Sequence, residues 1–243
     1  MAAARPPRGR VAATRRSARL WSGGGGRCEE GEQHGRPAVV ADLVRHTPPV
    51  PTLRITQDTA ADELLSRDPL ALVLGMMLDQ QFPMERAFAG PRLLADRLGV
   101  DTLAAADLAE ADPEQLAEAF RGPPAVHRYP GSMAARTQDL CRLLVERYDG
   151  RAERLWADVP DGATLLQRIG QLPGFGTQKS KILVALLGKQ YGVTPPGWRE
   201  AAGDYGREGS RRSVADVTGP ESLAQVRAAK QEAKRAAKAA VTS

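Results

Sequence analysis

The sequence has little of several residue types on which whole classes of site depend. It holds only two cysteines, Cys28 and Cys141, too few for a thiolate cage around zinc or an iron–sulfur cluster. No run of about twenty apolar residues could span a membrane, and the first residues carry Arg and Gly where a signal peptide needs an apolar stretch. No glycine-rich loop follows a strand pattern, as a nucleotide-binding fold requires. We therefore expect a cytoplasmic protein without a metal or a cofactor.

Basic residues exceed acidic ones in one part of the chain only. Nine of the 34 Lys and Arg residues lie within residues 1–50, against four of the 29 Asp and Glu residues. Residues 51–243 hold 25 of each sign and are formally neutral. A surface for nucleic acid in that part must therefore come from local segregation of charge.

Residues 1–50 show no sustained helical or alternating apolar period and include four consecutive glycines, Gly23–Gly26. Such a segment cannot bury enough surface to order itself, so we predict a disordered basic arm. Three interpretations of this arm stay open: it binds nucleic acid, it is a solvated Arg-rich tail, or it is translated only because the start site is misassigned. We predict no site within it.

From Thr52 onward the spacing of apolar residues and of capping residues, Pro and Gly indicates an all-α fold of two helical lobes. The helix opened by Asp68-Pro69 is apolar nearly all round, which is typical of a buried central helix. We divide the rest of the chain into a helical domain, residues 51–205, and an extension, residues 206–243. Helices are predicted from Asp58 or Thr59 to Leu65, from Pro69, and over Met84–Leu98, Leu103–Leu108, Pro113–Phe120, Ser132–Tyr148, Ala163–Ile169 and Thr177–Lys189.

The extension contains an Ala-rich helix with a basic face, predicted over Glu221–Ala240. A solvated terminal helix is the interpretation favoured by the sequence, and a contact with DNA is the alternative.

Between two predicted helices lies a tight reversal with two glycines, Gly174 and Gly176. Glycine at both positions permits backbone angles that are closed to other residues, and the amides from Phe175 to Thr177 are expected to point outward at a helix start, where an anion is favoured. Lys179 and Lys181 can neutralise neighbouring phosphates. This pattern favours a grip on the DNA backbone over an ordinary helical hairpin. The predicted contacts are Leu172, Pro173, Gly174, Phe175, Gly176, Thr177, Gln178, Lys179 and Lys181.

With these residues in view, the sequence resembles the helix-hairpin-helix (HhH-GPD) DNA glycosylase superfamily of base-excision repair. The hairpin is one match. The others are the apolar helix ending Leu78-Asp79-Gln80-Gln81 and the segment His127–Arg136. The resemblance covers about Thr52 to Trp198. In its overall residue pattern the sequence is more similar to an actinobacterial subgroup described as glycosylase-type base-excision repair proteins than to well-studied enzymes of the family.

The resemblance implies a monomer that binds damaged double-stranded DNA, probes it with Gln80 and Gln81, and extrudes a base into a pocket between the lobes. Family members that cleave through a Schiff base carry a lysine where this chain has Gln178. Lys179 lies about 100° further around the helix and should face elsewhere, so a lyase is not expected.

The family's aspartate is missing, because the corresponding stretch from Val193 to Trp198 holds no carboxylate. That aspartate stabilises developing positive charge or activates water. Asp79, Glu200 and Asp204 are the candidate substitutes. Three functions therefore stay open: a monofunctional glycosylase, a non-catalytic DNA-binding module, and a helical scaffold for a protein or RNA partner.

Overall fold

The computed structural model describes residues 51–242, and the predicted arm, residues 1–50, lies outside them. This part of the chain contains helices and no strand, so the prediction of an all-α fold is confirmed. The helices are α1 (Thr59–Arg67), α2 (Pro69–Leu78), α3 (Met84–Leu98), α4 (Ala105–Glu110), α5 (Pro113–Arg121), α6 (Pro130–Tyr148), α7 (Gly162–Gly170), α8 (Thr177–Gln190), α9 (Trp198–Ala202) and α10 (Pro220–Thr242), with 3₁₀ turns η1 (Ala152–Leu155), η2 (Gly203–Tyr205) and η3 (Val214–Asp216).

Aspartate caps start several helices where the sequence predicts them. The Asp58 carboxylate accepts the amide of Ala61, and Asp68 accepts the amides of Leu70 and Ala71 just after the chain passes Pro69. A carboxylate in this position satisfies amides that lack a partner within the helix and interacts favourably with the helix dipole.

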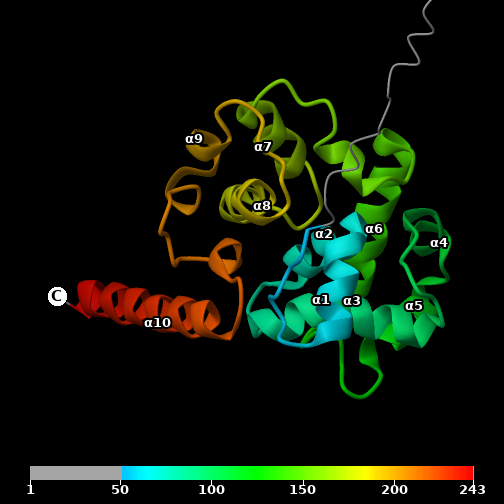
Figure 1. The fold of residues 1–243 in the computed structure, drawn as a ribbon. Helices are drawn as coiled ribbons and strands as arrows, with labels where there is room; N and C mark the ends of the chain where they lie inside the picture. Colours follow the sequence, from blue (N-terminus) through cyan, green and yellow to red (C-terminus); the bar gives the residue numbers. More distant parts are fainter. Residues whose placement is uncertain (1–50, 243) are drawn as a thin grey trace, which may run out of the picture. The chain divides into compact units, whose positions relative to one another are not determined.

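Helix α2 is the structural centre. Every residue from Leu70 to Leu78 is buried, as expected for a helix that is apolar all round. It packs against α1 and α3 of the lobe formed by α1–α6, and it also contacts α8 of the lobe formed by α7–α9 (Figure 1). The carboxyl end of α2 therefore lies at the junction of the two lobes.

The short elements η1, α9, η2 and η3 were not predicted. Helix α9 has five residues and begins after Gly197, whose φ of 72° is left-handed. Its Trp198 is buried against Gly188 of α8. A helix this short is not stable alone, so it forms only because tertiary contacts hold it.

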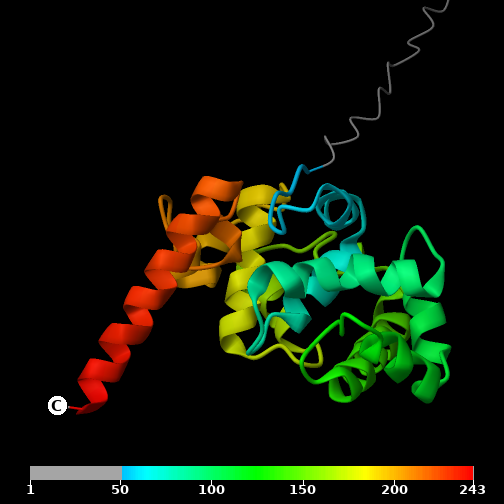
Figure 2. The ribbon, with the colours of Figure 1, turned by 90° about the horizontal axis from the view of Figure 1, so that it is seen from below.

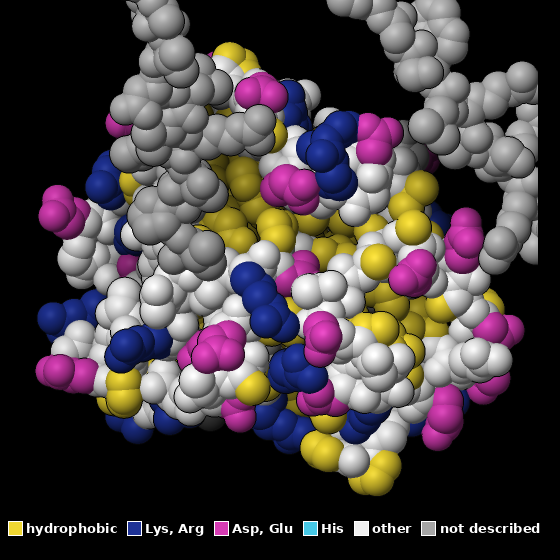
Figure 3. All heavy atoms as spheres, turned by 45° about the vertical axis from the view of Figure 1, so that its right-hand side comes forward, with side chains coloured by type: hydrophobic (Ala, Val, Ile, Leu, Met, Phe, Trp, Pro, Cys, Tyr) yellow, Lys and Arg dark blue, Asp and Glu magenta, His cyan; other side chains and the backbone are white. Residues whose placement is uncertain are grey.

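The surface of the described residues mixes charges of both signs. On the face drawn in Figure 3, Lys and Arg side chains are interspersed with Asp and Glu, with apolar side chains between them. None of the described helices is long and apolar enough to cross a membrane.

The contact between α8 and α9 gives a test of the fold. A Cβ on Gly188 would lie 2.3 Å from the Trp198 ring, so Gly188→Ala should lower the free energy of unfolding by about 1–3 kcal/mol despite the better helix propensity of alanine. The control is Gly131→Ala in α6, where a Cβ meets nothing within 4 Å; its stability should be unchanged or higher by up to about 1 kcal/mol. Urea unfolding of both variants decides, and equal stabilities would refute this packing.

Candidate functional site at the junction of α2 and α8

The turn between α7 and α8 needs a glycine at position 174. Gly174 has a φ of 84°, and a Cβ there would lie 2.7 Å from Cδ of Arg136 and 3.2 Å from Cγ of Met77. Both the left-handed backbone and the close packing exclude a side chain. The expectation that Gly174 adopts backbone angles closed to other residues is confirmed.

Gly176 is a different case. Its φ of −90° and ψ of 176° are extended angles that any residue adopts, so the expectation that its conformation requires glycine is wrong. A Cβ at this position would meet nothing within 4 Å. Gly176 is also the N-cap of α8 and offers no side chain to the first amides. The missing side chain leaves open space beside the start of the helix, where a phosphate can approach backbone N–H groups.

Leu172 and Phe175 are buried and hold the hairpin to the core, whereas Pro173 is half-buried and Thr177 and Gln178 are exposed. The Phe175 amide donates to the Leu172 carbonyl at 3.0 Å. It was expected to point outward for an anion, and that expectation is wrong because the turn itself uses this N–H.

The two lysines of the hairpin helix point in different directions. Lys181 lies beside Gly203, near the end of α9. Lys179 reaches α2, where its ammonium donates to the Met77 carbonyl. The expectation that Lys179 faces away from the surroundings of Gln178 is wrong, since both residues line one hollow.

This hollow has a volume of about 810 Å³ and lies where the end of α2, the first turns of α8 and the middle of α10 meet. Gln178 closes part of its wall by donating to the Tyr205 hydroxyl at 3.0 Å. The walls combine polar groups with apolar surface from Met76, Ile182 and alanines of α10. The polar and charged lining residues are Asp79, Gln80, Gln178, Lys179, Tyr205, Arg212, Lys230 and Glu232.

Asp79 is the carboxylate of the three candidates that lies in this hollow. Burial raises its pKa, the charges of Lys230 and Lys179 oppose the rise, and Glu85 adds to it. Burial in turn lowers the pKa of Lys179 to about 8, against the attraction of Asp79. Mutually perturbed groups in a hollow are typical of sites that move protons.

The residues after Asp79 are held in a fixed, unusual conformation. The Nε2 atom of buried His127 bonds to the Gln80 carbonyl at 3.1 Å, and its Nδ1 accepts the Tyr129 amide. Because Nδ1 accepts, Nε2 carries the proton and the ring is neutral; burial lowers the pKa of His127 accordingly. Gln81, exposed with a φ of 52°, is presented outward while Gln80 lines the hollow.

The other candidate carboxylates lie elsewhere. Glu200 is exposed on α9 and lines a separate shallow depression together with Asp204. Asp204 is paired with Arg207 and Arg212 at 2.9 and 3.2 Å. Trp198, at the start of α9, is buried in the core.

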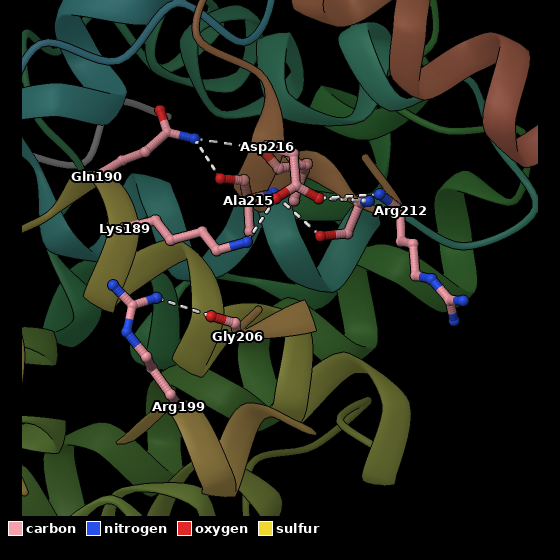
Figure 4. Close-up of polar contacts among 9 residues, drawn as sticks. Lys189, Gln190, Arg199, Gly206, Arg212, Ala215 and Asp216 are labelled. Atoms are coloured by element: carbon pink, nitrogen blue, oxygen red, sulfur yellow. Dashed lines mark hydrogen bonds and ion pairs between the residues drawn. The ribbon is translucent and has the colours of Figure 1, made fainter. Parts of the chain in front are cut away.

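A buried polar network fixes the segment that supplies the far wall. The Asp216 carboxylate accepts the Lys189 ammonium at 2.6 Å and the amides of Arg212 and Ser213. Gln190 donates to the Ala215 carbonyl at 2.8 Å. Figure 4 shows Lys189 and Gln190 reaching from α8 toward this segment. The contacts tie residues 212–216 to α8 and thereby position Arg212 and the start of α10.

Tyr205, Arg212 and Lys230 were missed as site residues. They lie in a segment rich in glycine and in an alanine-rich helix, and neither pattern indicates that they line the same hollow as Asp79. Only the packing of this segment on α8 brings them there.

The raised pKa of Asp79 predicts a pH-dependent stability change in Asp79→Asn. Below the unfolded-state pKa the carboxyl is protonated in both states. As pH rises above that value the unfolded chain ionises first, so the cost to stability grows and is complete once pH exceeds the higher folded-state pKa. The Asn variant should therefore gain more stability over the natural chain at about pH 8 than at about pH 4.5. Urea unfolding at both values measures this, with exposed Asp107→Asn as the control for loss of one charge. A gain that is the same at both values would contradict the burial of Asp79.

A family model described as HhH-GPD superfamily base excision DNA repair protein matches residues 74–241, more than half of the chain. Neither a curated protein nor a solved structure gives a match. The family match starts and ends later than the resemblance indicated, and it includes the extension that sequence reasoning left outside. The actinobacterial subgroup stays a prediction. With the hairpin, the all-α fold and this match together, the chain belongs to the HhH-GPD superfamily of base excision DNA repair proteins.

Proposed function

We propose that this protein is a monofunctional DNA glycosylase that clamps the DNA backbone with the α7–α8 hairpin and takes an extruded base into the hollow beside Asp79. The observation that carries the proposal is the hollow itself: it lies between α2 and α8 and contains a carboxylate with a raised pKa. A cleft filled with apolar side chains would have favoured a non-catalytic module instead.

Asp79 has the chemistry that hydrolysis of an N-glycosidic bond needs. In this reaction the bond from C1′ to the base nitrogen breaks, and its electron pair leaves with the base. Water forms the new bond to C1′ and gives one proton to the Asp79 carboxylate, which then passes it to the departing base. Meanwhile the negative carboxylate stabilises positive charge on the sugar. Its higher pKa makes Asp79 a stronger base than an exposed aspartate.

The proposed enzyme does not cleave the strand. Gln178 stands at the position of the family's Schiff-base lysine, and an amide nitrogen is not a nucleophile. The Lys179 amine is in the hollow, but it is bonded to the Met77 carbonyl, which holds it against α2.

A non-catalytic DNA-binding module remains the second candidate, because Pro195 and Pro196 occupy the stretch where the family has its aspartate. In that case Asp79 would have no part in chemistry.

The decisive experiment is a single-turnover assay on duplexes carrying uracil, alkylated or oxidised bases. We expect release of at least one base, with strand breaks only after alkali and no borohydride-trapped complex. Asp79→Asn should slow release by roughly a hundredfold or more, whereas exposed Glu200→Gln should stay within about twofold. Tight binding without any release would favour the module. Equal losses in both variants would remove Asp79 from the mechanism.

Gly176 tests the hairpin separately from the chemistry. Its open surroundings allow Gly176→Ala to fold, but the added methyl should block a phosphate and weaken binding roughly tenfold. The loss should be the same for every DNA sequence, because phosphate contacts carry no sequence information. Gly219→Ala, also in open space, is the control. Fluorescence anisotropy with several duplexes measures the effect, and unchanged affinity would exclude the hairpin as a clamp.

A further inference from the structure

The buried side chains of helix α10, among those that the structure describes, lie near its start, and Lys230 contacts the Met84 sulfur at 3.9 Å. Leu223 and Val226 are buried, and Arg227 pairs with Glu85 of α3 at 2.8 Å. Beyond Arg227 the described side chains are exposed up to residue 236, except for half-buried Ala229. Figures 1 and 2 both show the later turns projecting from the neighbouring helices. Burial against the rest of the protein therefore does not account for the turns of α10 beyond Arg227.

The exposed part of α10 is basic on one side. Lys230 and Lys234 are four residues apart, which places them about 40° from each other around the helix. Neither forms an ion pair within residues 51–242. Like charges at this spacing destabilise a helix by roughly 0.2–0.5 kcal/mol, so the pair does not serve the helix itself. Glu232 lies roughly 160° from Lys230 around the helix, at the other edge of the wall that lines the hollow.

One residue of this basic side, Lys230, borders the candidate site. Five residues of α10 line the hollow together with Asp79 and the first turns of α8: Ala229, Lys230, Glu232, Ala233 and Ala236. The charge of Lys230 is close enough to lower the pKa of Asp79. A polyanion that binds at the start of α8 with one unit in the hollow would pass the wall formed by α10. Lys230 lies on that wall, and Lys234 lies about one helical turn further along α10.

We propose that Lys230 and Lys234 on α10 form a second contact with the DNA phosphate backbone, across the hollow from the hairpin. The proposal rests on the proposed function, since it takes duplex DNA as the occupant. Charge complementarity and continuity with the hollow favour DNA over the other polyanionic partner of a basic helix, an anionic lipid surface.

The test is the salt dependence of DNA binding. Each phosphate contact contributes about 0.9 to the slope of log affinity against log salt concentration. The double variant Lys230→Gln with Lys234→Gln keeps a good helix former at both positions and should lower the slope by about 1.8. The control, Arg121→Gln with Arg142→Gln, removes the same charge from exposed positions on α5 and α6 and should leave the slope unchanged.

The slopes are measured by anisotropy between about 50 and 200 mM salt, alongside sedimentation with vesicles containing phosphatidylserine. A drop in slope confined to the α10 variant supports the proposal. An unchanged slope in a protein that still binds DNA overturns it and leaves the proposed function standing. Vesicle binding that depends on Lys230 and Lys234, with DNA binding unaffected, assigns α10 to a lipid surface instead. Failure of the natural chain to bind DNA overturns both proposals.

Discussion

The hydrogen bond from the Lys179 ammonium to the Met77 carbonyl joins the two halves of the candidate site. Lys179 belongs to the first turn of the hairpin helix, and Met77 belongs to the last turn of the buried helix α2. The bond therefore fixes the position of the hairpin relative to Asp79 and Gln80. A carbonyl near the end of a helix is a favourable acceptor for a cation, which helps to offset the desolvation of the lysine.

The same junction sets the electrostatics of the site. Burial works against ionisation of both Asp79 and Lys179, and each group partly offsets the penalty of the other. Two partly buried groups of opposite charge add little to the free energy of unfolding. Their protonation states, however, respond to small changes in the surroundings. A base entering the hollow and displacing water would be one such change.

The wall opposite α2 depends on a buried ion pair between Lys189 and Asp216. The carboxylate of Asp216 also accepts two backbone amides, so its charge is well compensated in the interior. This arrangement holds the chain after α9 against α8 and directs α10 toward the hollow. It explains how a segment of glycines and a helix of alanines become part of a site without carrying any recognisable motif.

The sequence by itself determined the local features. The aspartate caps and the continuous apolar surface of Leu70–Leu78 specify helix starts and a buried helix because they act over one or two turns. The Gly174 turn is equally local, as is the hairpin motif on which the family resemblance depends.

Of the three candidate carboxylates, the sequence offered no means of choosing one. The tertiary structure decided that Asp79 lies in the hollow between α2 and α8, whereas Glu200 and Asp204 line a separate depression. It also decided that Lys179 turns inward, that Gly176 is free of conformational constraint, and that Tyr205, Arg212 and Lys230 line the same hollow as Asp79. These outcomes depend on contacts between residues that are far apart in the chain, such as Met77 and Lys179, and the local spacing of residue types carries no information about such contacts.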